Sequence, residues 1–271
     1  MSATASPALD AAHLSPGRIL TAEWLKLITV RSTFWTSAVA LVLAALATVA
    51  LGLTFSRQEG AVNGGVGPQL LLLGSTLSLT FVALIVGVLG VLAIGGEYTT
   101  LQIRSTYAAV PHRWPALAAK GLIVGAWSFA LGLVITFGSF GLLALFFGAR
   151  GLTVALDAEV LGGLLGGAAY LAVVGVFAVG LGALVRSTAA GITILTALLF
   201  VAPIILGLLA AVLRAEWVST LSRYLISSAG GDLYAAPASA GLPIWAAAIT
   251  LLVWVAAIWS LAIATTLRRD V

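Results

Sequence analysis

Six long apolar runs dominate the pattern of the chain, and polar residues do not alternate within them. Each run has about 20 residues or more, the length at which a helix crosses the hydrocarbon layer. A membrane barrel would instead show strands of alternating polarity. The pattern predicts an all-α integral membrane protein that forms one transmembrane domain over 1–271. Its six expected spans are about 33–54, 69–95, 117–148, 161–185, 189–213 and 242–267.

Composition supports lipid as the main solvent of the chain. Hydrophobic residues make up 61% and charged residues 8%, with a mean hydropathy of +1.16, whereas soluble domains carry about 25% charged residues. There is no Cys and there are two His, which excludes thiolate chemistry and disfavours a metal site. Lys and Arg never cluster beyond two adjacent positions, so the net charge of +4 does not indicate a nucleic-acid partner.

The distribution of Lys and Arg predicts the orientation of the spans. With both termini in the cytoplasm, nine of the 13 basic residues lie in inner segments and four in outer segments, as the positive-inside rule requires. The expected location is the plasma membrane, with several passes. The nine inner positions are Arg18, Lys26, Arg31, Arg104, Arg113, Lys120, Arg186, Arg268 and Arg269.

The segment before the first span has its own pattern. Residues 1–15 are small and polar and are expected to form a disordered tail, whereas 17–31 reads as an amphipathic helix lying in the membrane interface. The alternative is a polar start of the first span. The apolar side of the expected helix carries Leu20, Trp24, Leu27 and Ile28, and the opposite side carries Arg18, Ala22, Lys26 and Thr29.

The inner segment after the second span is the most informative stretch. Glu97 lies where a helix ends, a position that disfavours negative charge, so a basic partner is expected. Ile103, Tyr107 and Val110 then recur at helical spacing, and Pro111 ends the pattern. The segment is expected to be a short amphipathic cytoplasmic helix, either a docking surface for a partner or a plain interfacial loop helix.

Two further groups of residues are candidates for a transport path. Ser75, Ser78 and Thr80 make the second span the most polar, so they could line a pathway or hold helices together. In the outer segment 214–241, Trp217 and Tyr224 lie on one helical face before Gly230 and Gly231 break the pattern. That segment is either an outer gate or an ordinary interfacial loop.

Several kinds of chemistry are missing from the sequence. The centres of the expected spans carry no charged residue, although proton-driven carriers normally need a carboxylate there. No phosphate-binding loop of the G-x-x-x-x-G-K-[ST] type occurs either. Energy for uphill transport would therefore come from another subunit.

Three motifs lie around the first spans. The opening motif comprises Glu23, Trp24, Lys26, Arg31, Ser32, Thr33, Phe34 and Trp35. The inner motif comprises Glu97, Tyr98, Thr99, Ile103, Arg104, Ser105 and Thr106, and its continuation comprises Ala108, Val110, Pro111, Arg113, Ala118 and Lys120. With these motifs the chain resembles the permease subunit of ABC transporters of the type-2 exporter class. Such permeases commonly read E-Y-x-x-G-T-I-R after the second span, where this chain has Leu101 and Gln102 in place of Gly-Thr.

The resemblance implies a mechanism. Two permease copies, identical or paralogous, would form the translocation path, and each would sit on a separate ATP-binding subunit that holds ATP and Mg²⁺. This chain would bind no cofactor and would have no catalytic residue. The connecting helix would use Glu23, Trp24, Lys26 and Arg31. The ATPase-coupling residues would be Glu97, Tyr98, Ile103, Arg104, Tyr107, Pro111 and Arg113.

Three other functions compete with export. A non-transport scaffold or immunity protein could share the fold, and co-purification of an ATPase would distinguish the two. A membrane enzyme would need paired carboxylates, Cys or clustered His, which the sequence lacks. An ion-coupled carrier is disfavoured by the uncharged span centres.

Overall fold

The computed structural model describes residues 15–57, 68–100, 102, 114–152, 154–235 and 241–268, and these residues form helices without any strand. The helices that build the bundle are α2 (Arg31–Arg57), α3 (Pro68–Thr76), α4 (Leu79–Thr99), α6 (Trp114–Gly148), α7 (Ala158–Val185), α8 (Thr188–Thr196) and α12 (Ile244–Arg268). The remaining elements are α1 (Pro16–Thr29), η1 (Ala197–Val201), α9 (Ala202–Leu213), α10 (Glu216–Arg223) and α11 (Ile226–Asp232).

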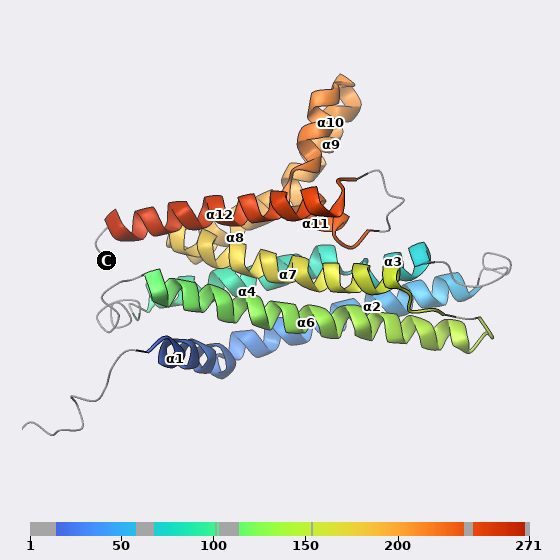
Figure 1. The fold of residues 1–271 in the computed structure, drawn as a ribbon, viewed down its shortest axis with the longest axis horizontal. Coiled ribbons are helices and arrows are strands. Elements are labelled where there is room, and N and C mark those ends of the chain that lie inside the picture. The colour runs from blue at the N-terminus through green and yellow to red at the C-terminus, as the bar shows by residue number, and fades with distance from the viewer. Residues whose placement is uncertain are drawn as a thin grey trace, which may run out of the picture.

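Within the described residues, six helical segments are long and apolar enough to cross a membrane, which confirms the expected count. They run roughly along one direction, except that α9, the last part of the fifth segment, turns away from the bundle (Figure 1). Helix α1 and the end of α12 lie at the same end of the bundle. We call this the α1 end. The six segments are Arg31–Thr54, Gln69–Thr99, Trp114–Gly148, Ala158–Val185, Thr188–Leu213 and Ile244–Thr266.

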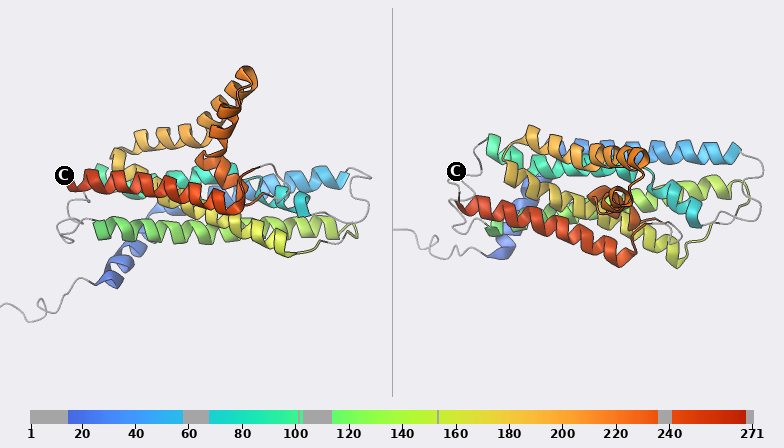
Figure 2. Two further views of the ribbon diagram at one scale, coloured as in Figure 1. Left: turned by 45° about the horizontal axis from the view of Figure 1, so that its top comes forward. Right: turned by 90° about the horizontal axis from the view of Figure 1, so that it is seen from above.

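Helix α7 is the centre of the bundle, with α4, α6 and α12 packed around it. Figure 2 shows α7 enclosed between these helices in both views. Close approach depends on glycine, because a Cβ at Gly90 of α4 would lie 2.7 Å from the carbonyl oxygen of Gly175 and 2.8 Å from the Cβ of Ala178. Most glycines of α7 likewise lie at close contacts within the chain, whereas a Cβ at Gly162 would meet no atom within 4 Å in the described part of the chain.

The second span is interrupted, whereas a continuous helix over 69–95 was expected. Helix α3 ends at Thr76, Leu77 and Ser78 form a turn, and α4 begins at Leu79. The Thr76 hydroxyl donates to the carbonyl oxygen of Leu72 at 2.5 Å. Hydroxyl side chains that bond the helix backbone in this way bend or weaken a helix, which accounts for the break in a hydroxyl-rich stretch.

The fifth span also departs from the single helix expected over 189–213. After α8 the backbone widens into the π-helix η1, and Pro203 follows at the start of α9. Proline lacks an N–H and its ring clashes with the preceding turn, so the helix changes direction. Helix α9 leaves the side of the bundle, pairs with α10, and buries none of its residues (Figure 1).

The outer segment after α9 contains two short helices. The prediction that Gly230 and Gly231 break a helix was wrong, because both lie inside α11. Gly230 has no room for a side chain, since a Cβ there would overlap the ring of Tyr170. Helix α11 therefore packs tightly against α7, and it also contacts α12.

The N-terminal helix exists but is shorter than the expected range 17–31. Ser15 caps it by accepting a hydrogen bond from the backbone N–H of Arg18 at 3.3 Å, and Pro16 occupies the first turn, as is typical of helix starts. Val30 adopts an extended conformation that ends α1 and separates it from α2. Helix α1 consequently runs at an angle to the spans (Figure 2).

A matched pair of glycine substitutions tests the α4–α7 crossing. We expect Gly90→Ala to lower the free energy of unfolding by about 1–3 kcal/mol, because the added methyl group overpacks a backbone contact. Gly138→Ala is the control, since a Cβ there would meet no atom within 4 Å in the described part of the chain. Denaturant unfolding in detergent micelles measures both. Equal stability of the two variants would contradict the tight crossing.

Candidate functional site

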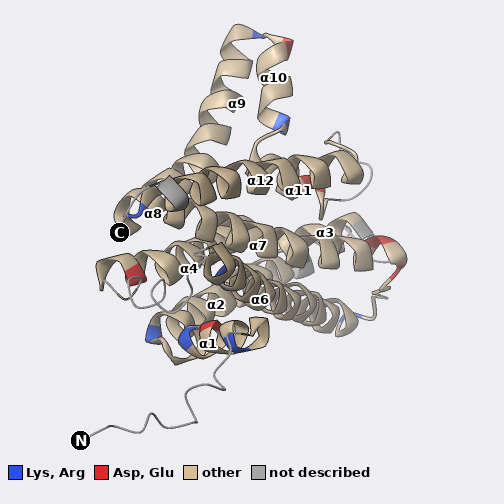
Figure 3. Cartoon of the chain, turned by 60° about the vertical axis from the view of Figure 1, so that its left-hand side comes forward, with Lys and Arg blue, Asp and Glu red and all other residues tan. Residues whose placement is uncertain are grey.

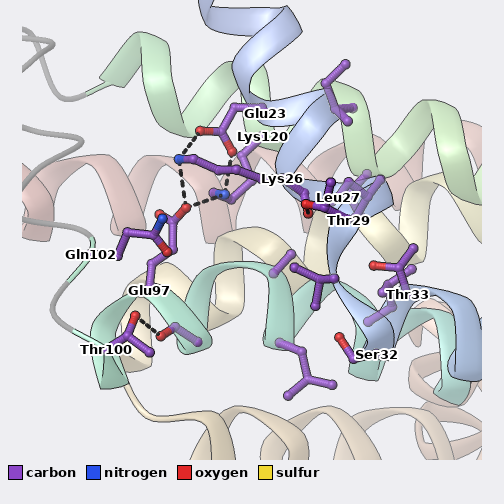
Figure 4. A pocket seen from close by; sticks show the side chains of 17 residues that line it. Glu23, Lys26, Leu27, Thr29, Ser32, Thr33, Glu97, Thr100, Gln102 and Lys120 are labelled. Atoms are coloured by element: carbon purple, nitrogen blue, oxygen red, sulfur yellow. Dashed lines mark hydrogen bonds and ion pairs between the residues drawn. The ribbon is translucent and has the colours of Figure 1, made fainter.

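Four charged side chains from three helices meet at the α1 end of the bundle. Glu23 and Lys26 come from α1, Glu97 from the last turn of α4, and Lys120 from α6 (Figure 4). The Lys26 ammonium lies 2.7 Å from Glu23 Oε1 and 2.9 Å from Glu97 Oε1. The Lys120 ammonium lies 2.5 Å from Glu23 Oε2 and 3.0 Å from Glu97 Oε1. Acid and base alternate around a closed arrangement, which we call the ion-pair ring.

Three of the four ring members are almost fully buried. Glu23 is 4% exposed, Glu97 5% and Lys120 5%. An isolated buried charge is costly, whereas neighbouring opposite charges with hydrogen bonds offset much of that cost. With two acids and two bases the ring carries no net charge, so removing any one member would leave an uncompensated charge in a largely buried setting.

The local sequence explains how the ring assembles. Glu23 and Lys26 are three positions apart, so they share one face of α1. Lys120 lies about two turns into α6, next to the end of α4 that carries Glu97. The expected basic partner of Glu97 is therefore present twice, as Lys26 and Lys120.

Lys26 is the ring member nearest to solvent, with 30% of its side chain exposed. Burial alone would lower the pKa of its ammonium, but hydrogen bonds to Glu23 and Glu97 outweigh burial and raise the pKa above its usual value near 10.5. A raised basic pKa stabilises the fold below the ordinary value, and the stabilisation is lost as the pH rises through the folded-state value. The Lys26 charge therefore supports the ring throughout the neutral range.

A cavity of about 350 Å³ lies beside the ring. All four ring members line it, and it is bounded by α1, the start of α2, α4 and α6 (Figure 4). Its remaining lining residues are Leu27, Thr29, Val30, Ser32, Thr33, Leu89, Leu92, Ala93, Gly96, Thr100, Gln102, Ile123 and Val124.

Aromatic contacts hold α1 against the bundle beside the ring. The rings of Trp24 and Trp127 meet edge to face with their centroids 5.9 Å apart. The Trp127 indole N–H donates to the Ser37 hydroxyl at 3.1 Å, which links α6 to α2. Trp24 remains 39% exposed, so one side of it is available to lipid or a partner.

A second set of contacts lies at the same end of the bundle, around Tyr98. The Arg186 guanidinium lies 5.6 Å from the centre of the Tyr98 ring, and it donates to the carbonyl oxygen of Thr265 at 3.3 Å. Arg186 has a left-handed backbone conformation with φ of 56° and ends α7. This arginine thereby links the ends of α4, α7 and α12.

The structure brings together some of the expected site residues and leaves others apart. Arg31 is exposed at the start of α2 and is not one of the charges in the ring. The expected amphipathic helix after the second span lies outside the described residues, except for 97–100 and 102. The expected coupling positions that lie outside are Ile103, Arg104, Tyr107, Pro111 and Arg113.

The structure also places the expected pathway residues and the expected gate residues in different surroundings. Ser75 and Ser78 are buried, and neither hydroxyl has a hydrogen-bond partner within the described chain, whereas Thr80 is exposed. Trp217 is exposed on α10 away from the bundle. Tyr224 follows α10, and its carbonyl oxygen accepts a hydrogen bond from the Trp254 indole at 2.9 Å.

Two residues of this end, Lys120 and Arg186, were not assigned a role in the candidate site, although Lys120 belongs to the motif that follows the second span. Lys120 could have been found as a lone cation within an apolar run, because such a charge needs a buried acid. Arg186 stands between two closely spaced spans, but its left-handed conformation and its contact with Tyr98 depend on the tertiary arrangement. Of the described residues, no three His, Cys, Asp or Glu side chains form a metal-binding group.

Replacing Lys120 tests the ring. We expect Lys120→Met to lower the free energy of unfolding by about 3–5 kcal/mol, because Glu23 and Glu97 would share one ammonium in a buried setting. The double variant Glu23→Gln with Lys120→Met should lose less than the sum of the two single variants. Arg150→Gln, at an exposed position beyond the far end of α6, is the control. Additive losses would argue against a coupled ring.

Sequence comparison identifies no relative of the chain in which the ion-pair ring could be sought. No protein-family model matches the chain, and no curated protein matches it.

Proposed function

We propose that the chain is the membrane-spanning permease subunit of an ATP-driven exporter of the ABC type-2 class. Two copies would form the translocation path, and a separate subunit would bind ATP and Mg²⁺. The observation that carries the proposal is the ion-pair ring. It joins α1 to the ends of α4 and α6, which are the two helices that the 100–113 segment connects.

The ring offers a mechanical route for work done on that segment. A displacement of the segment acts on the ends of α4 and α6, and α1 moves with them because three of the four ring charges are buried and paired. Helices α4 and α6 both pack on α7, the centre of the bundle. Work done by a cytoplasmic ATPase would in this way reach the core of the transmembrane domain.

The placement of charge supports an external source of energy over ion coupling. Charged residues gather at the ends of the described spans, and the middles of those spans carry none (Figure 3). Glu23 and Glu97 are each paired with lysines at one end of the bundle. A carboxylate that binds and releases protons during transport normally lies near the bilayer midplane.

Co-purification tests the proposal directly. The tagged full chain, extracted from its own membranes in mild detergent, should bring down an ATP-binding subunit and show ATP hydrolysis that vanadate inhibits. Replacing both Arg104 and Tyr107 with Ala should reduce the recovered ATPase by about tenfold, the effect of losing about 1.4 kcal/mol of binding.

Arg150→Ala is the matched control, since Arg150 lies beyond the opposite end of α6. Wild-type recovery of the ATPase is expected for this variant. A fully folded chain that never associates with an ATPase, or an association indifferent to the 100–113 segment, would favour a non-transport scaffold instead.

The orientation of the chain can be tested with single cysteines, because the sequence has none of its own. Thr100→Cys, at the α1 end, should react with a membrane-impermeant maleimide only after the cells are opened. Leu156→Cys, which is 52% exposed in the connection before α7, should react in intact cells. The reverse pattern would place the α1 end outside and remove the basis for a cytoplasmic ATPase.

A further inference from the structure

The cavity beside the ion-pair ring changes in polarity along α4. Thr100 and Glu97 line its polar end, and Ala93, Leu92 and Leu89 continue along the helix toward the middle of the bundle. From position 100 to position 89 the helix rises about 16 Å. Ile123 and Val124 of α6 add to the apolar wall. Charge at one end and hydrocarbon at the other match the layout of a phospholipid at the edge of a membrane.

Glu97 supplies a hydrogen-bonding group that the protein leaves unused. Its Oε1 accepts from both Lys26 and Lys120. Its Oε2 is buried and has no hydrogen-bond partner among the described residues. A buried carboxylate oxygen without a donor is destabilising, because the hydrogen bonds it made to water are not replaced. A ligand with N–H groups would therefore be favoured beside it.

Lys120 supplies the complementary group. An ammonium carries three N–H donors, and Lys120 gives two of them to Glu23 and Glu97. The third N–H has no acceptor in the described part of the chain. It can therefore donate to a phosphate oxygen, and the nearby Lys26 adds a second positive charge at the cavity wall.

We propose that this cavity binds a phospholipid whose headgroup carries both a phosphate and a primary ammonium, as in phosphatidylethanolamine. The ammonium donates to Glu97 Oε2, the phosphate accepts from Lys120, and an acyl chain lies along Leu92 and Leu89. Such a headgroup is zwitterionic, so the net charge of the ring stays at zero. The lipid site does not depend on export and would remain if the chain were a scaffold.

Other membrane lipids satisfy only part of the site. A choline headgroup has a quaternary nitrogen without N–H, so it cannot donate to Glu97 Oε2. A glycerol headgroup has no cation, and its phosphate would add an uncompensated negative charge near Glu23 and Glu97. A primary ammonium is therefore the feature that sets the specificity.

A lipid titration of the full chain tests the site. Delipidated protein in detergent is titrated with dioleoyl phosphatidylethanolamine, phosphatidylcholine or phosphatidylglycerol, and native mass spectrometry gives Kd for the first bound lipid. We expect the ethanolamine lipid to bind about tenfold more tightly than the choline lipid, the effect of one hydrogen bond to a charged group. It should also raise the Tm by at least about 2 °C more.

Two variants locate the binding within the cavity. Glu97→Gln should bring the ratio of the two Kd values close to one, and Ala93→Phe should weaken both lipids because it fills the apolar wall. Glu159→Gln, in the first turn of α7, is the control and should keep the tenfold ratio. Ala93→Phe leaves the ring intact, so it gives a result even if Glu97→Gln does not fold.

Two outcomes would overturn the assignment. Equal affinity of the wild-type protein for ethanolamine and choline lipids would remove the role of Glu97 Oε2. Tighter binding of the glycerol lipid would mean that the cavity recognises phosphate alone. Neither outcome bears on whether an ATPase associates with the chain. The lipid site and the proposed export function can therefore be refuted independently of each other.

Discussion

The structure depends on the neutralisation of charges that the fold removes from water. Glu23, Glu97 and Lys120 are almost completely buried, where an unpaired charge costs several kcal/mol. The ring brings residues from α1, α4 and α6 to within hydrogen-bonding distance of one another. No hydrophobic contact could fix the position of α1 as specifically, because ion pairs require particular atoms at particular distances.

The α1 end and the rest of the bundle differ in the contacts that hold their helices together. At the α1 end, the ring, the Trp24–Trp127 contact and Arg186 join α1, α4, α6, α7 and α12 through polar and aromatic contacts. Elsewhere the chain relies on close helix packing and contains irregular elements, namely the α3–α4 turn and the π-helix η1. Irregular helix geometry is often found where function requires movement. Under the proposed export function, these irregular elements are where the spans would change shape in response to work done at the α1 end.

Much of the architecture could be predicted because the bilayer permits few solutions. A backbone in hydrocarbon must satisfy its own hydrogen bonds, so run length and hydropathy were sufficient to count six spans. The need of Glu97 for a basic partner also followed from its position at a helix end. The break before Leu79 and the bend after η1 could not be located as easily, because both depend on competition between side chains and backbone within otherwise uniform apolar runs.

The sequence by itself determined that lipid surrounds most of the protein. It also determined the number of spans and which charged residues lie near the ends of those spans. Tertiary structure decided which charges meet. Glu23 and Glu97 are 74 positions apart, and the distance between two such residues follows from helix packing, which hydropathy does not encode. It also decided that Gly230 lies inside a helix, because the ring of Tyr170 occupies the space where a side chain would be. Each helix forms because its backbone N–H and C=O groups must be hydrogen-bonded within the segment. The site forms only when the helices pack closely against one another.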